Sequence, residues 1–145
     1  MTGTGASRVR AAVAAAVPGW FGPEASLLSC DGPAAHAWSH QFDAVVDTPA
    51  GRKALVVKVP RWEEAPTLDA ALEAGPQEST RREHATLEAL AAAVRESGDA
   101  DLTAVTPVGY LAEINAVVTE RLAAEPLRLL LGRRPGSERR RGAVL

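Results

Sequence analysis

The sequence is poor in several residue types that define common protein classes. It has one cysteine, Cys30, so neither an intrachain disulfide nor a thiolate metal cluster can form within the chain. No hydrophobic run approaches the roughly 18 to 20 residues that span a bilayer. The start of the chain also lacks the basic and apolar regions of a signal peptide. We therefore expect a cytoplasmic protein with no membrane partner.

An excess of one charge is also lacking. The formal net charge is −2, so no overall basic field is available to hold a nucleic acid, and we expect no nucleic-acid partner. Lysine occurs only twice, as Lys53 and Lys58, against a background of many arginines. The one basic cluster is the arginine-rich stretch over residues 133–141, which is typical of a solvated tail.

The residues that are present are typical of one globular domain, with 46% hydrophobic and 23% charged residues in a chain of 145. Helical periodicity predicts helices over Ser7–Val17, Thr67–Ala74 and Ser79–Arg95. We expect Pro18-Gly19 to end the first helix and Gly98 to stop the third. The third helix carries its apolar residues on one side, which is formed by Leu87, Leu90, Ala91 and Val94.

Strand-like runs alternate with these helices. They cover Ser26–Cys30, Gln41–Asp47, Lys53–Val59, Ala104–Leu111 and Ile114–Glu120. The turn residues Thr48–Gly51 join the second and third runs into a hairpin, and the last two runs form a second hairpin. The sequence therefore predicts an α+β fold.

Lys58 stands out because it lies inside the apolar strand over residues 54–59. An ammonium group among apolar neighbours costs free energy unless it is paired or contacts an anion. Two interpretations follow. Lys58 is either an edge-strand lysine that points to water and hinders aggregation, or an anion-binding lysine held by a glutamate of a helix.

Glu83 is the candidate partner, and it also has two interpretations. Thr80 and Glu83 fit a capping box, in which Glu83 closes the helix N-terminus. A position beside Lys58 instead requires the helix to begin earlier, near Pro76, so that Glu83 lies about two turns inside it. The local pattern alone favours the cap.

Cys30, His36 and His40 also invite a chemical interpretation, either as metal ligands or, for Cys30, as a nucleophile. Pro33 and the neighbouring glycine argue against the helix turn that would bring the two histidines together. We interpret the histidines as ordinary loop residues and expect no metal site.

The order of the segments resembles the N-terminal lobe of the protein-kinase-like fold, in the form found in aminoglycoside phosphotransferases and related small-molecule kinases. Val57–Arg61 is similar to the strand that carries the ATP-binding lysine, and Arg82–Leu87 to the helix segment that carries its glutamate partner. Thr119–Leu122 is similar to the hinge that meets the adenine. The similarity extends over about residues 26–131.

The resemblance implies a small antiparallel sheet of about five strands, one long packed helix and an extra N-terminal helix. It implies ATP and Mg²⁺ as ligands, with Lys58 on the phosphates, Glu83 orienting Lys58, and Val56 against the adenine.

The resemblance also implies the remaining cofactor contacts. The backbone of Glu120, Arg121 and Leu122 would present the adenine edge. The segment Cys30–His40 has no G-x-G-x-x-G pattern, so Ser39 and neighbouring N–H groups would cover the phosphates there.

By this resemblance residues 1–25 form a helical extension, residues 26–126 form the lobe ending in the hinge, and residues 127–145 begin a helix at Leu127–Leu131 and continue as the tail. The family's catalytic and metal-binding aspartates and its asparagine lie beyond the hinge, where this sequence has none of them, since its last aspartate is Asp101 and its only asparagine is Asn115. We therefore assign no catalytic residue and expect the chain to be inactive alone. A missing or separately encoded catalytic lobe is the expected partner, and the small-molecule acceptor stays open.

Two alternatives remain. The chain is a non-enzymatic α+β protein-interaction module that binds a partner through its bare sheet surface, or it has a different α+β fold with no relation to nucleotide binding.

Overall fold

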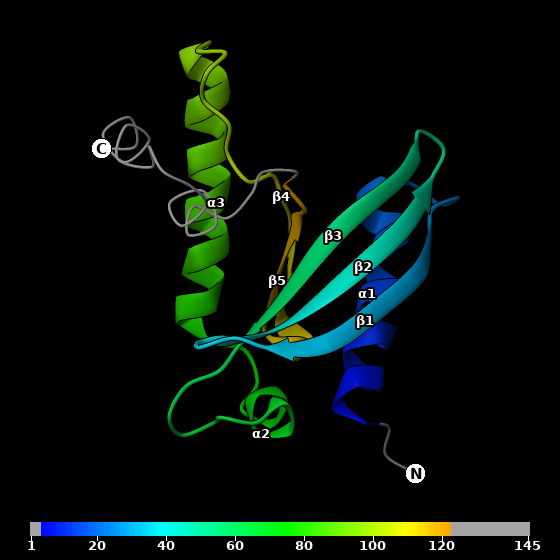
Figure 1. Ribbon diagram of the computed structural model, residues 1–145, viewed down its shortest axis with the longest axis vertical. Helices are drawn as coiled ribbons and strands as arrows, with labels where there is room; N and C mark the ends of the chain where they lie inside the picture. Colours follow the sequence, from blue (N-terminus) through cyan, green and yellow to red (C-terminus); the bar gives the residue numbers. More distant parts are fainter. Residues whose placement is uncertain (1–3, 123–145) are drawn as a thin grey trace, which may run out of the picture.

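The protein is α+β, with a five-stranded antiparallel sheet flanked by helices (Figure 1). The computed structural model describes residues 4–122. The strands follow the order β1-β2-β3-β5-β4, so β3 lies in the middle of the sheet. In chain order the elements are α1 (Gly5–Phe21), β1 (Ser26–Ala35), β2 (Ser39–Thr48), β3 (Gly51–Pro60), α2 (Leu68–Glu73), α3 (Glu78–Ser97), β4 (Pro107–Leu111), η1 (Ala112–Ile114) and β5 (Ala116–Glu120).

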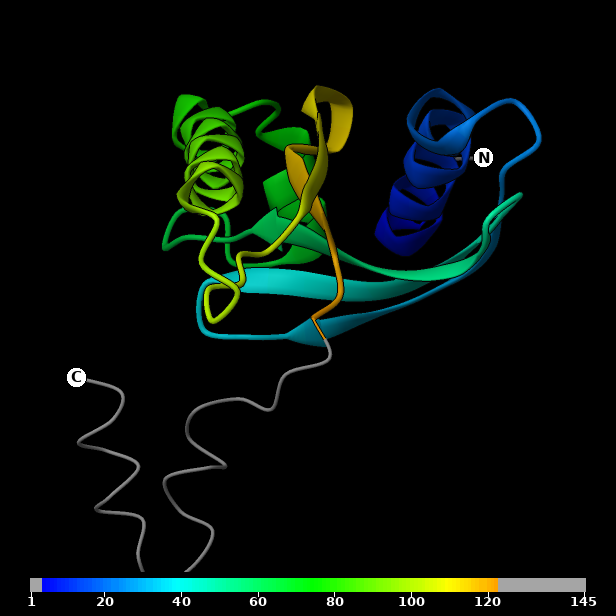
Figure 2. The same cartoon turned by 90° about the horizontal axis from the view of Figure 1, so that it is seen from above.

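Strand pairing divides the side chains of the sheet between two faces. Phe42 of β2 lies opposite Val57 of β3, and both belong to the core that α1 and α2 cover. We call this side the α1 face. Gln41 lies opposite Lys58 on the other side, which we call the α3 face because Lys58 contacts α3. Figure 2 shows α1 and α3 on either side of β4 and β5.

Helix α1 is longer than the sequence predicts, because Pro18 and Gly19 do not end it. Pro18 lies within the last turn, where its carbonyl accepts a hydrogen bond from the Gly22 N–H at 2.9 Å. Trp20 and Phe21 pack against the core. Burial of these two rings outweighs the single helical hydrogen bond that proline cannot donate.

Strand β1 is also longer than predicted, because it continues past Cys30 to Ala35. Its pairing with β2 shifts register between Asp31 and Ala34, around Gly32-Pro33. Such a bulge lets a strand pass through residues that otherwise signal a turn. The connection between β1 and β2 is therefore short and consists of His36, Ala37 and Trp38.

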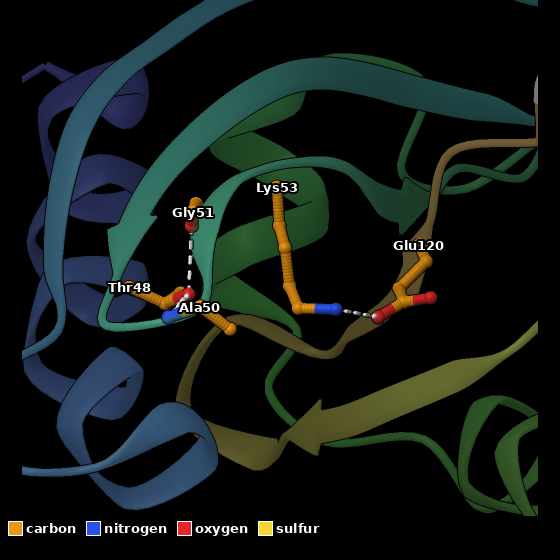
Figure 3. A network of polar contacts seen from close by, with 5 residues as sticks. All are labelled: Thr48, Ala50, Gly51, Lys53 and Glu120. Carbon is orange, nitrogen blue, oxygen red and sulfur yellow. Dashed lines mark hydrogen bonds and ion pairs between the residues drawn. The ribbon is translucent and has the colours of Figure 1, made fainter.

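The predicted hairpin of β2 and β3 is confirmed. At its turn the Thr48 hydroxyl donates to the Gly51 carbonyl at 2.7 Å and accepts from the Ala50 N–H at 3.2 Å (Figure 3). The second predicted hairpin, of β4 and β5, is confirmed as well, with η1 and Asn115 at its turn.

Helix α3 begins after Gln77 and ends at Gly98, whose left-handed φ of 67° suits glycine. Thr80 and Ala91 are its buried residues. Leu90 belongs to the apolar side of this helix in the sequence, but 52% of this residue is exposed. The sheet strands that α3 packs against are β4 and β5, so the buried stripe is narrower than the apolar stripe in the sequence.

Within residues 4–122, no helix has the length and apolarity needed to cross a membrane. The predicted helix start at Leu127–Leu131 and the arginine-rich tail lie outside the described residues.

Candidate functional site

The centre of the candidate site is an ion pair between Lys58 of β3 and Glu83 of α3. Lys58 Nζ donates to Glu83 Oε1, although the residues are 25 positions apart in sequence. About a third of each side chain is exposed, at 33% and 36%. The pair is thus shielded on one side and open to a ligand on the other.

The structure excludes the simpler interpretation of each partner. Lys58 is not on an edge strand, because β3 lies between β2 and β5. Glu83 is not part of a cap, because Gln77 occupies the N-cap position and Thr80 is buried in the first helical turn. The early helix start that a Lys58 partner requires is therefore present.

Asn115 fixes the N-terminus of α3, and so the position of Glu83. Asn115 is fully buried and has a left-handed φ of 49°. Its Oδ1 accepts the Gln77 N–H at 3.0 Å and the Tyr110 hydroxyl at 2.9 Å. The turn between β4 and β5 is thereby tied to the first residue before α3.

A cleft of about 450 Å³, which we call the lysine cleft, opens beside the ion pair. It brings together Lys58, Arg61 and the first turn of α3, and a helix N-terminus carries a partial positive charge. These groups suit an anion such as a phosphate. The lining residues are Trp38, Lys58, Pro60, Arg61, Trp62, Gln77, Ser79, Thr80 and Glu83.

A smaller cavity of about 200 Å³, the apolar pocket, also borders this ion pair. Lys58 and Glu83 line both cavities. The other lining residues of the apolar pocket are Val56, Leu87, Val105, Val117 and Thr119. A ligand with a flat apolar part and an anionic part therefore finds a surface for each part, with Lys58 between them.

Glu120 and Arg121 use their backbone N–H groups within the sheet. The Glu120 N–H donates to the Thr106 carbonyl and the Arg121 N–H to the Ala54 carbonyl, both at 2.9 Å. These two N–H groups therefore hold the end of β5 in place. Leu122, the third predicted hinge residue, is exposed.

The side chains of the two residues point to opposite faces of the sheet. Glu120 reaches Lys53 across the α1 face at 3.1 Å (Figure 3). Arg121 pairs with Asp43, which lies opposite Val56 on the α3 face. An adenine on Val56 would therefore lie next to this second ion pair.

Ser39 is buried at the start of β2, where its Oγ accepts a hydrogen bond from Gln41 Nε2 at 3.3 Å. It does not line the lysine cleft, whereas its neighbour Trp38 does. Within residues 4–122, no group of three His, Cys, Asp or Glu side chains is arranged to hold a metal ion.

Comparisons with protein-family models, curated proteins and solved structures found no match. Interpretation of the site therefore rests on its own geometry.

The cleft residues that sequence reasoning missed include Trp38, Arg61 and Trp62. It also missed the anchoring role of Asn115. A local signal existed for the tryptophans, since aromatic residues make up only 4% of the chain and two of the three tryptophans lie in turns. No local pattern could place Asn115 against Gln77, because the two residues are 38 positions apart.

Proposed function

We propose that this chain is the nucleotide-binding lobe of an ATP-dependent phosphotransferase that acts on a hydroxyl group of a small molecule. One observation carries the proposal: the ion pair of Lys58 and Glu83 lies on an interior strand between the cationic lysine cleft and the apolar pocket. An adenine nucleotide needs both kinds of surface, one for its base and one for its phosphates. The cytoplasm, where ATP is abundant, is the location we propose.

Each group of the site has a role in this proposal. The adenine lies on Val56 in the apolar pocket, with Glu120 to Leu122 along its edge. Lys58 binds the phosphates in the lysine cleft, and Glu83 holds the ammonium group in position by accepting its hydrogen bond. Trp38 at the tip of the β1–β2 hairpin covers the cleft next to Ser39.

In the proposed reaction the bond between the γ-phosphorus and the bridging oxygen to the β-phosphate breaks, a bond from the acceptor oxygen to that phosphorus forms, and the hydroxyl proton is released. The catalytic aspartates come from a catalytic lobe on the same or another polypeptide. Mg²⁺ neutralises phosphate charge in such reactions. The described residues offer no ligand cluster for it, so we assign no Mg²⁺ ligand.

Calorimetric titration of the 145-residue polypeptide with ATP tests the proposal. Lys58→Met should weaken ATP binding by about 10- to 100-fold, because it removes a charge-assisted hydrogen bond. Glu83→Gln should weaken it less, since the lysine keeps its charge. In both variants the free energy of unfolding should fall by no more than about 1 kcal/mol, because the side chains of the ion pair are about a third exposed.

Lys53→Met is the matched control. Lys53 lies on the same strand and also pairs with a glutamate, Glu120, but it lies on the α1 face. The Lys53→Met variant should have an ATP affinity within about twofold of that of the unmodified chain. Undetectable binding of ATP, or equal losses for the two lysine variants, would contradict the proposed function.

A further inference from the structure

A third cavity, of about 420 Å³, adjoins the lysine cleft and shares no lining residue with the apolar pocket. We call it the tryptophan cavity. Its lining residues are Ala37, Trp38, Arg61, Trp62, Glu63 and Pro66. Trp38, Arg61 and Trp62 also line the lysine cleft, so the two spaces share a wall. The lysine cleft therefore shares lining residues with both of the other spaces, which share none with each other.

Both tryptophans are carried by anchored turns. The Arg61 N–H donates to the Trp38 carbonyl at 3.0 Å, and Arg61 Nε donates to the Ala37 carbonyl at 3.4 Å. Trp62 and Ala65 exchange backbone hydrogen bonds of 3.4 Å and 3.0 Å. Binding of a ligand that contacts both tryptophans would therefore cost little free energy for ordering the backbone.

The chemistry of the wall indicates the kind of ligand. Trp38 is 78% exposed, although a tryptophan side chain is usually largely buried. Indole faces bind rings that have a flat apolar face. Arg61 and Glu63 add a hydrogen-bond donor group and an acceptor group to the lining, which suit polar substituents such as hydroxyls. The volume lies within the usual range for a small-molecule site.

We infer that the tryptophan cavity binds a ring-shaped alcohol, stacked on Trp38 and Trp62, with its hydroxyl groups at Arg61 and Glu63. A sugar and an aromatic alcohol share this chemistry. The acceptor role of this ligand rests on the proposed function, because the cavity opens next to the expected position of the phosphates. Binding of the ring does not depend on that function.

Calorimetry with methyl α-D-glucopyranoside and with benzyl alcohol tests the inference, with acyclic glycerol as a reference. One of the two ring compounds should bind saturably, and the compound that binds identifies the ligand as a sugar or as an aromatic alcohol. Trp38→Ala and Trp62→Ala should each weaken this binding by at least about fivefold, whereas Trp38→Phe and Trp62→Phe should retain most of it.

Two further variants separate the possible outcomes. Leu90→Ala removes another exposed apolar side chain, on α3, and should bind the ring as the unmodified chain does. Lys58→Met should lose ATP affinity and keep ring affinity. Ring binding by an unmodified chain that binds no ATP would count against the proposed function alone. Failure of both rings to bind better than glycerol, or equal binding by Trp38→Ala and Leu90→Ala, would overturn the inference.

Discussion

At the scale of single residues, His40 makes the stability of the protein depend on pH. It is buried at the start of β2, and burial, together with the nearby positive charge of Arg61, lowers the pKa of His40 below its ordinary value of 6.5. The unfolded chain therefore binds a proton at a higher pH than the folded chain does. By linkage, the contribution of His40 to stability is complete above about pH 6.5 and is lost as the pH falls toward the folded-state pKa.

Urea unfolding between pH 7.5 and 5 measures this effect. The free energy of unfolding should decrease over this range, and His40→Gln should reduce the decrease. His36→Gln is the control, because His36 is an exposed residue of the neighbouring turn. A pH profile that is the same for His40→Gln and the unmodified chain would show that His40 is not the group responsible.

The residue scale also shows what a single sequence can reveal about the site. Lys58 could be singled out, because a cation within an apolar strand requires an explanation. The role of Glu83 could not be decided, because its two interpretations differ only in where α3 begins. That start depends on the hydrogen bond between Asn115 and Gln77, which no local pattern encodes.

At the scale of elements, the N-terminus of α3 is tied to the β4–β5 turn through the hydrogen bond between Gln77 and Asn115. Asn115→Ala removes the acceptor of two partly buried hydrogen bonds and places alanine at a left-handed φ. We expect a loss of about 2–4 kcal/mol in unfolding free energy and weaker ATP binding, because Glu83 loses its fixed position. Urea unfolding and calorimetry measure the two effects.

Tyr110→Phe is the control for this element. It removes the tyrosine hydroxyl but keeps the bond between Asn115 and Gln77. Its stability should fall by about 1 kcal/mol, with ATP affinity unchanged. Comparable losses of ATP affinity in the two variants would show that the anchor of α3 does not position Glu83.

Elements with strong local signals were predictable, and elements that depend on distant contacts were less so. Both hairpins follow from alternation and turn residues. The extension of α1 through Pro18 depends on burial of Trp20 and Phe21, and the extension of β1 past Cys30 depends on pairing with β2 across a bulge. Such contacts outweigh local preferences and are not visible in one segment of sequence.

At the scale of the whole molecule, we expect the 145-residue polypeptide to bind ATP without transferring phosphate. The resemblance places the catalytic aspartates beyond the hinge, and this sequence has no aspartate after Asp101. In an assay for ADP release with ATP, Mg²⁺ and each ring alcohol, the unmodified polypeptide and the Lys58→Met variant should give the same rate. A higher rate that Lys58→Met abolishes would show that the chain carries its own catalytic groups.

The placement of the only two lysines on one strand makes each face of the sheet chemically distinguishable. Lys53 lies on the α1 face and Lys58 on the α3 face, five residues apart. An amine-reactive label followed by mass spectrometry therefore samples both faces in one short peptide. Protection of Lys58 by a bound molecule can be read against Lys53 as an internal standard, without any substitution in the protein.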